Sequence, residues 1–221
     1  MAQGMISYDE ARVPSTLAVR PTGHRFEIRN RRELQRRRVA SHRMAVPPRR
    51  VLVLGTGNPL RTDGGIGART VETLQAFLAF SDNVTFVGDR ALCLGLLDTL
   101  MEADAVIVID AVRTGGRPGT LHTLTGDRLQ RTLTDSEFPH QVRLADTLAV
   151  ADILGRRPET VMVAIEPEDM SSWNTQLTET VELRIPDLLA AALIEIERMG
   201  GECMPKCVHP QAVLACDLVS A

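Results

Sequence analysis

Five short apolar or strand-like runs, separated by helix-like stretches, most constrain what this chain can fold into. The third of them, Ala105 to Ile109, holds no polar residue and ends at Asp110. Such a run is typical of a strand buried on both faces, as the strands of parallel sheets are. The other four runs span residues 51–54, 83–87, 120–124 and 160–165. The run at 120–124 is the more polar one, and we expect it at an edge of the sheet.

Apolar residues recur at helical spacing between these runs. The predicted helices cover about residues 65–80, the stretch from Cys93 to Leu100, a stretch opened by Pro139, and a last one through 189–196. Alternation of strand and helix predicts an α/β fold, a three-layer α/β/α sandwich around a largely parallel, twisted sheet of about five strands. In such folds, ligands and catalytic groups lie at the carboxyl ends of the strands.

The formal net charge of −3 is the balance of two unlike parts. Residues 1–50 hold 12 Arg and 4 acidic residues, a net charge of +8, whereas residues 51–221 hold 13 basic and 24 acidic residues, a net charge of −11. We therefore predict a disordered Arg-rich extension over 1–49, a domain over 50–205 and a tail over 206–221. A nucleic-acid role for the extension would rest on charge alone, and we expect no nucleic-acid partner.

The composition also bears on location and on cysteine chemistry. No run approaches 18 consecutive apolar residues and the start lacks the apolar core of a signal peptide, so we expect a cytoplasmic protein with no membrane partner. Four cysteines in 221 residues do not resemble a disulfide framework. Cys203, Cys207 and His209 form a C-x3-C-x-H group, a weak zinc signal that we place in an exposed tail.

Polar residues that follow the apolar runs are the candidates for chemistry, because the strand ends share one edge of the sheet. They are Asn58, Asp63, Asp89, Asp110 and His140. The Gly55-x-Gly57 turn invites comparison with the dinucleotide-binding fingerprint, but Leu60 stands where the third glycine would be. Acidic residues entering the site also repel phosphate, so nucleotide binding is disfavoured. A serine hydrolase is disfavoured too, because the chain has no G-x-S-x-G motif.

Asp63, Asp110 and His140 each lie on a different strand-to-helix connection. Oxygen and nitrogen ligands of this kind can converge on a divalent metal that keeps open coordination positions. Ordinary structural roles are open as well: Asp63 could cap the helix that begins near Gly64, Asp110 could hold the loop after its strand, and His140 could be a polar residue at a helix start. Spacing alone favours these structural roles, since convergence cannot be seen in a sequence.

Five motifs in a fixed order resemble those of the hydrogenase maturation proteases, which trim the C-terminus of the large subunit of [NiFe] hydrogenases. The likeness covers about residues 50–205. The motifs are Gly55-Thr56-Gly57-Asn58-Pro59-Leu60-Arg61-Thr62-Asp63 with Gly65-Ile66-Gly67; Gly88-Asp89; Val108-Ile109-Asp110-Ala111; Pro139-His140-Gln141 with Leu144-Ala145-Asp146; and Ile165-Glu166-Pro167-Glu168 with Leu177-Thr178.

The resemblance implies a metal-dependent endopeptidase that removes a short C-terminal peptide from a nickel-loaded large-subunit precursor. It implies Asp110 and His140 as metal ligands. Asn58 and Asp89, which follow strands, are our candidates for loop residues near the substrate. The ion would be nickel or another divalent metal, held by the protease or supplied by the substrate. The family is usually read as acting alone, so we expect a monomer.

One position departs from the family at the decisive place. The family has two adjacent acidic residues in the first loop, the second being the metal ligand, whereas Asp63 is followed here by Gly64. Asp63 is our candidate substitute ligand. The alternative is a catalytically impaired relative that binds only the precursor or a metal. A smaller departure is Arg143, where the family usually has glycine.

Overall fold

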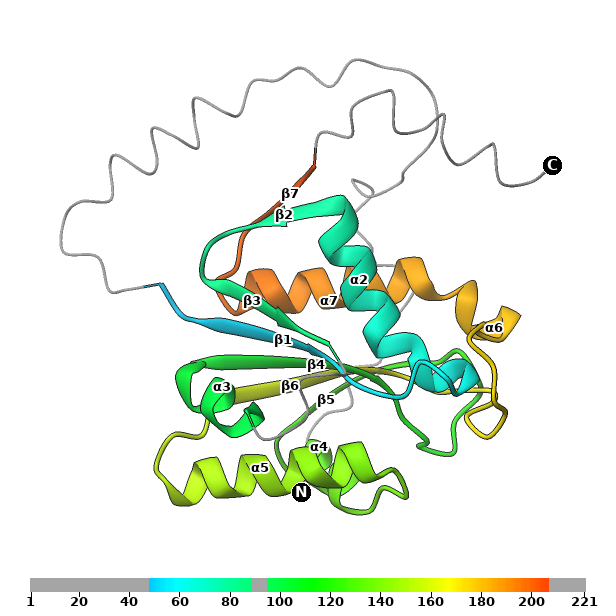
Figure 1. Cartoon of the computed structure of the whole chain (residues 1–221), viewed down its shortest axis with the longest axis horizontal. Helices are drawn as coiled ribbons and strands as arrows, with labels where there is room; N and C mark the ends of the chain where they lie inside the picture. Colours follow the sequence, from blue (N-terminus) through cyan, green and yellow to red (C-terminus); the bar gives the residue numbers. More distant parts are fainter. Residues whose placement is uncertain (1–47, 89–94, 207–221) are drawn as a thin grey trace, which may run out of the picture. The chain divides into compact units, whose positions relative to one another are not determined.

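A five-stranded sheet forms the centre of the part of the chain that the structure describes. The computed structural model describes residues 48–88 and 95–206. The strands run in the order β3-β1-β4-β6-β5 (Figure 1). They are β1 (Val51–Gly55), β3 (Val84–Val87), β4 (Ala105–Ala111), β5 (Leu121–Thr125) and β6 (Glu159–Ile165). The first four in this order are parallel and β5 is antiparallel to β6. The expected parallel sheet with a more polar edge strand is therefore confirmed.

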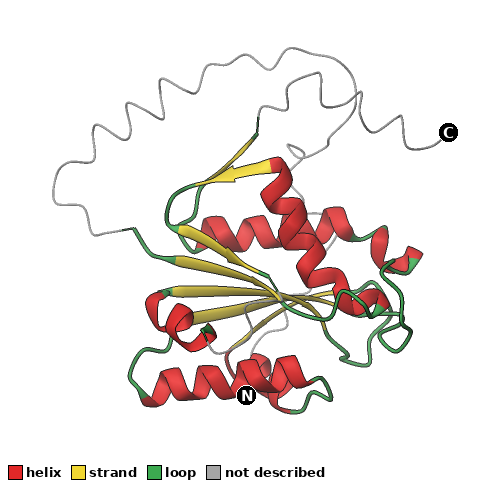
Figure 2. Cartoon of the chain, viewed as in Figure 1, coloured by secondary structure: helices red, strands yellow, loops and turns green. Residues whose placement is uncertain are grey.

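Helices cover both faces of the sheet (Figure 2). Helices α2 (Ile66–Phe77) and α7 (Ile185–Arg198) share one apolar core with one face. Helices α3 (Leu96–Glu102), α4 (Gly126–Thr134) and α5 (Pro139–Ile153) share a second core with the other. Strand β4 is buried along its whole length and alternates its side chains between the two cores. The three-layer α/β/α sandwich predicted from the sequence is thus confirmed.

Local pattern was misleading at the end of α2. The predicted helix over 65–80 ends at Phe77, and residues 78–80 instead form strand β2 (Leu78–Phe80). That strand pairs antiparallel with β7 (Cys203–Pro205), far away in the sequence. Only this distant pairing makes the segment extended, so a local reading could not find it.

Besides β2 and β7, three short or polar elements were not predicted from the sequence. They are α4, the 3-10 helix η2 (Thr62–Gly65) and α6 (Glu179–Glu182). Helix α4 buries only Leu129 and Leu133, a single helical repeat among polar residues. Such a helix carries too few apolar positions to show a period.

Glycines let α2 approach the sheet very closely. A Cβ atom added at Gly67 would lie 2.2 Å from the carbonyl oxygen of Thr56 and 2.3 Å from that of Ile109. Both of those atoms belong to the backbone just at the ends of β1 and β4. The glycines of the first motif are therefore needed for backbone packing at the carboxyl edge of the sheet, and this packing brings the loop between β1 and α2 next to the end of β4.

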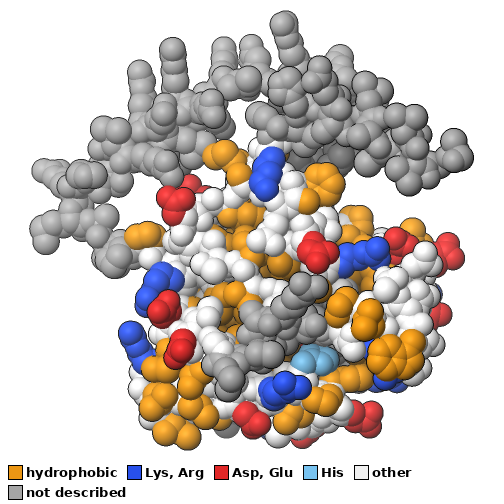
Figure 3. Space-filling view, in the orientation of Figure 1, with side chains coloured by type: hydrophobic (Ala, Val, Ile, Leu, Met, Phe, Trp, Pro, Cys, Tyr) orange, Lys and Arg blue, Asp and Glu red, His pale blue; other side chains and the backbone are white. Residues whose placement is uncertain are grey.

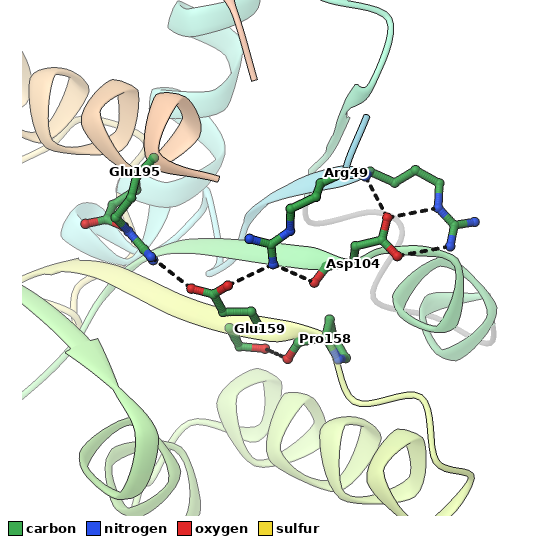
Figure 4. Close-up of polar contacts among 8 residues, drawn as sticks. Arg49, Asp104, Pro158, Glu159 and Glu195 are labelled. Carbon is green, nitrogen blue, oxygen red and sulfur yellow. Dashed lines mark hydrogen bonds and ion pairs between the residues drawn. The ribbon is translucent and has the colours of Figure 1, made fainter. Parts of the chain in front are cut away.

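Ion pairs tie together the opposite, amino edge of the sheet (Figure 4). Arg49 donates to Glu159 at 2.8 Å and to the carbonyl oxygen of Asp104 at 3.2 Å. Arg198 bridges from the end of α7, donating to Glu159 at 2.8 Å and to Glu195 at 2.6 Å. Hydrogen bonds from Arg198 and Arg49 lower the pKa of Glu159 below its ordinary value. The charged side chains at this edge are paired with one another. The candidate site is therefore sought at the carboxyl edge.

Several sequence predictions concern residues outside the described ranges. They are the Arg-rich extension up to residue 47, the tail from residue 207 on, Asp89, Cys93, Cys207 and His209. Within residues 48–88 and 95–206, no helix has the length and apolar character needed to cross a bilayer.

Candidate functional site

Asp110 and His140 meet at the carboxyl edge of the sheet. Asp110 lies near the end of β4, and His140 is the second residue of α5, whose first residue is Pro139. The Nε2 atom of His140 lies 3.0 Å from Oδ2 of Asp110. The Asp110 side chain is fully buried, whereas the His140 side chain is 16% exposed. The pair thus presents an imidazole at the surface, backed by a carboxylate that solvent does not reach.

Gln141 fixes the position of the Asp110 carboxylate. Its Nε2 atom donates to Oδ2 of Asp110 at 2.8 Å and to the carbonyl oxygen of Ala111 at 3.0 Å. The second carboxylate oxygen of Asp110 accepts the backbone N–H of Ala111 at 2.8 Å. Both oxygens of Asp110 therefore have donors, and its orientation toward His140 is set by buried groups.

The direction of this hydrogen-bond chain follows from its partners. Ser136 Oγ accepts the backbone N–H of Phe138 at 3.0 Å and lies 2.5 Å from Oε1 of Gln141. Its own proton then goes to Gln141, which leaves the amide NH2 group for the acceptors Asp110 and Ala111. The loop before α5 thus orients Gln141, and Gln141 orients Asp110.

Asp63 has a different role: its side chain joins two loops by hydrogen bonds. Its side chain is fully buried. Oδ2 accepts the backbone N–H groups of Glu168 at 2.9 Å and Asp169 at 2.8 Å. Oδ1 accepts the backbone N–H of Thr178 at 2.8 Å and its hydroxyl at 2.9 Å. The Asp63 carboxylate therefore holds the segment that follows β6 against the loop that follows β1.

The structure does not gather the three predicted ligands into one group. Within residues 48–88 and 95–206, no three His, Cys, Asp or Glu side chains lie where they could hold a metal ion. The Asp63 side chain does not cap a helix either: the N–H of Ile66 bonds to the backbone carbonyl of Asp63. The structural role expected for Asp63, a helix cap, is therefore wrong: the side chain joins two loops instead.

Glu166 is a second buried carboxylate that holds a loop by hydrogen bonds at the same edge of the sheet. Its carboxylate accepts the backbone N–H of Thr114 at 2.9 Å, the Thr114 hydroxyl at 2.6 Å and the N–H of Gly115 at 3.2 Å. His122 Nε2 lies 3.2 Å from the Thr114 hydroxyl oxygen. Burial lowers the pKa of His122, although Glu166 acts in the opposite direction. The neutral ring then donates its Nε2–H to Thr114, whose own proton is bound to Glu166.

Gly64 lies beside Asp110, where the family would have its acidic ligand. Gly57 has φ = +115°, and a Cβ atom there would lie 2.0 Å from the Gly64 carbonyl oxygen and 3.2 Å from Oδ1 of Asp110. Gly64 and Asp110 therefore flank the same glycine. A Cβ atom at Gly64 itself would meet Arg61 Cβ at 3.2 Å and Met170 Cε at 3.7 Å. A side chain at position 64 needs only a small shift of Arg61.

Asn58 is exposed and stabilises its own turn. Its Oδ1 accepts the backbone N–H of Leu60 at 2.9 Å, and its carbonyl accepts that of Arg61 at 2.9 Å. This is the local bonding by which asparagine forms tight turns. These hydrogen bonds stay within the turn, so the predicted place of Asn58 beside the substrate stays a prediction.

The chemistry of the donor set fits a divalent ion in part. Asp110 and His140 supply one oxygen and one nitrogen donor, the types that zinc and other first-row transition metals accept. Two side chains fill half of a tetrahedral site or a third of an octahedral one. An ion at this place would need its remaining ligands from water or from a bound substrate.

Sequence reasoning missed the residues that organise this site. Gln141 and Glu166 belong to quoted motifs but had no role assigned, and Ser136 was not singled out. Nothing in the sequence marks a glutamine as buried. Its position directly after His140 at a helix start was the one available signal.

Comparison with known proteins places these residues in context. A family model described as HycI, hydrogenase maturation protease, matches residues 68–195. The hydrogenase expression/formation protein HupD of Bradyrhizobium diazoefficiens is 36% identical over 151 residues, which is 66% of this chain and 79% of that protein. The hydrogenase 2 maturation protease of Escherichia coli is 33% identical over 159 residues, 71% of this chain and 96% of that protein. The solved structure of the hydrogenase maturating endopeptidase HybD from E. coli superposes with a TM-score of 0.66 at 33% identity, covering 71% of this chain and 98% of that one.

Proposed function

This chain belongs to the hydrogenase maturation protease family, and we propose that it is a metal-dependent endopeptidase that removes a short C-terminal peptide from the nickel-loaded large-subunit precursor of a [NiFe] hydrogenase. Endopeptidase activity follows from membership of the family. The precursor as substrate, the metal and the cut at its C-terminus are the proposed parts. We also propose that the enzyme works as a monomer in the cytoplasm.

The Asp110–His140 pair is the observation that carries the proposal. It joins a fully buried carboxylate to a partly exposed imidazole at the sheet edge where α/β folds place their chemistry. When bound, a divalent ion supplies Lewis-acid polarisation of a peptide carbonyl. The chain's own residues orient the site: Gln141 holds Asp110, and Asp110 holds the Nε2 side of the His140 ring.

The two-donor arrangement favours an ion that arrives with other ligands. The missing family acid at Gly64 leaves the described residues with two side-chain donors at this place rather than three. Nickel already bound in the precursor would bring its own protein ligands. We therefore favour the substrate as the source of the metal over a tightly held resident ion.

The direct test is cleavage of nickel-loaded precursor by purified protein, followed by mass spectrometry of the precursor. We expect loss of the C-terminal tail with the natural protein, and a drop of about 100-fold or more with Asp110→Asn or His140→Ala, since each removes a donor. Asp187→Asn, a half-buried change at the start of α7 that loses only an ion pair with Arg184, is the control and should cleave normally. An intact tail after incubation with the natural protein would refute the proposal.

The alternative of an impaired relative has its own test, Gly64→Glu. Restoring the family's acid beside Asp110 should tighten binding of Ni²⁺ or Zn²⁺ to the free protein by at least about tenfold, measured by calorimetry. Gly64→Gln controls for the added side chain. If the natural protein binds precursor without cutting and Gly64→Glu cuts it, the impaired reading is correct. Full cleavage by the natural protein, unchanged by Gly64→Glu, excludes it.

A further inference from the structure

An exposed aromatic side chain stands on the loop that Asp63 anchors. Trp173, the single tryptophan of the sequence, is 70% exposed, and Leu60 on the facing loop is 52% exposed. The guanidinium of Arg61 lies 3.9 Å from the centroid of the Trp173 ring. We call Leu60, Arg61 and Trp173 the aromatic platform. Hydrophobic side chains reach the surface at several places on the molecule (Figure 3), but this group combines Trp and Arg, the residues most enriched at binding hot spots.

Backbone hydrogen bonds hold the aromatic platform in place. Asn174 donates its N–H to the carbonyl of Leu60 at 3.1 Å, and Thr62 donates its N–H to the carbonyl of Asn174 at 2.8 Å. The Arg61 side chain adds a hydrogen bond to the carbonyl of Ser171. Because the two loops are fixed to each other, binding of a partner here costs little conformational entropy in the loops.

The platform continues into the turn that borders Asp110. Gly64 donates its N–H to the carbonyl of Arg61 at 2.6 Å, closing a single turn. The Gly64 carbonyl in turn lies against Gly57, next to Asp110. The turn from Arg61 to Gly64 therefore links the platform to the backbone that borders Asp110.

The platform is chemically suited to an apolar group next to a carboxylate. In the part of the chain that the structure describes, no carboxylate forms an ion pair with Arg61; its contacts are a carbonyl oxygen and an aromatic ring. A cation held on an aromatic face keeps its charge available to an anion while the ring and Leu60 offer apolar area.

We propose that the aromatic platform of Leu60, Arg61 and Trp173 binds the C-terminal extension of the precursor through an apolar side chain and a carboxylate. This deepens the proposed function and rests on it. The carboxylate is an Asp or Glu side chain of the extension or its C-terminal group. The platform acts in binding, away from the bond that is cut.

The intrinsic fluorescence of Trp173 reports on this site directly, since no other tryptophan contributes. The probe is a synthetic peptide with the sequence of the C-terminal extension, titrated into the full-length protein. We expect the emission to shift to shorter wavelength as the ring leaves water. Arg61→Gln and Leu60→Ser should each raise the Kd at least about tenfold. Ile153→Ala, which removes an 84% exposed apolar residue at the far end of α5, should leave the Kd unchanged.

Two peptide variants identify the carboxylate. An amidated C-terminus that weakens binding assigns the terminal group, and Asn or Gln replacements that weaken it assign an acidic side chain. If the peptide binds and neither change matters, the charge part of the proposal is wrong. No fluorescence change and no dependence of binding on Leu60 or Arg61 would overturn the proposal as a whole.

Cleavage kinetics separate this inference from the proposed function. Trp173→Ala should raise KM for the nickel-loaded precursor at least about tenfold with a similar kcat, because the platform binds substrate without acting on the bond. Asp110→Asn should abolish cleavage but keep peptide binding at the platform. An unchanged KM in Trp173→Ala refutes the platform while leaving the protease function standing. Peptide binding without any cleavage by the natural protein refutes the protease function alone.

Discussion

Three buried carboxylates lie at the carboxyl edge of the sheet, and each does different work. Asp63 and Glu166 accept hydrogen bonds from loop backbone, whereas Asp110 faces His140. The acidity at the strand ends suggested a metal site, yet two of these three carboxylates hold loops in place. The chemical identity of a residue does not tell these roles apart; the partners of its oxygens do.

Asp63→Asn tests whether Asp63 holds two loops together or binds a metal ion. The amide offers one acceptor where the carboxylate now serves three N–H groups and a hydroxyl, so we expect the free energy of unfolding to fall by about 2 kcal/mol or more. Urea unfolding measures this change, and calorimetry with Ni²⁺ or Zn²⁺ should show an unaltered Kd. Lost metal binding with normal stability would instead identify Asp63 as the substitute ligand.

At the scale of elements, the contact between α2 and the ends of β1 and β4 positions the site. Glycine at position 67 lets the first turn of α2 touch the backbone of both strands. The same contact carries the turn from Arg61 to Gly64 up to Asp110. The glycines of the first motif are therefore needed for packing as much as for chemistry. A comparison with nucleotide-binding turns, in which glycines make room for phosphate, does not suggest this packing role.

Gly67→Ala should disrupt this contact. The added methyl group would lie 2.2 Å and 2.3 Å from two backbone oxygens, so the helix must shift, and we expect a loss of about 3 kcal/mol in the free energy of unfolding. Gly95→Ala is the matched control, since a Cβ atom at Gly95 meets nothing within 4 Å. Thermal and urea unfolding compare the two variants. Equal stability would show that α2 can move away from the strands at little cost.

At the scale of the whole molecule, charges are distributed between the two edges of the sheet. Ion pairs gather at the amino edge around Glu159, and buried carboxylates that accept hydrogen bonds from loop backbone gather at the carboxyl edge. The stability of the protein should therefore fall with acid in two stages, one from His122 and one from the paired carboxylates.

The first stage has a definite sign. Burial puts the pKa of His122 in the folded protein below its ordinary value of 6.5, so the unfolded chain binds more protons as the pH falls below about 7. Stability is complete above the unfolded pKa and is lost as the pH falls through the folded one. We expect the urea midpoint of His122→Gln to change less between pH 7.5 and 5.5 than that of the natural protein. A midpoint that falls equally in the variant would place the effect elsewhere.

The second stage belongs to Glu159 and Asp104, whose pKa values lie below the ordinary one. Hydrogen bonds from the side chains of Arg198 and Arg49 lower the pKa of Glu159, and hydrogen bonds from the backbone N–H and then the side chain of Arg50 lower that of Asp104. Their contribution is present above the ordinary carboxylate pKa and is lost below it. Both side chains are substantially exposed, so Glu159→Gln should change stability at pH 7 by about 1 kcal/mol or less. The same variant should show a weaker loss of stability below pH 4.

The sequence by itself determined the five strands of the central sheet, their alternation with helices and the layered fold, and it placed Asp110 and His140 among the candidates at one edge. These follow from periodicity and from the rule that parallel strands end together, both of which are properties of local sequence. Only the tertiary structure decided which buried acids hold loops, that Gln141 orients Asp110, that residues 78–80 form a strand, and that Leu60 and Trp173 share a surface. Each of these depends on contacts between segments up to 127 positions apart, such as Leu78 and Pro205 or Asp63 and Thr178, and no local pattern encodes such a contact.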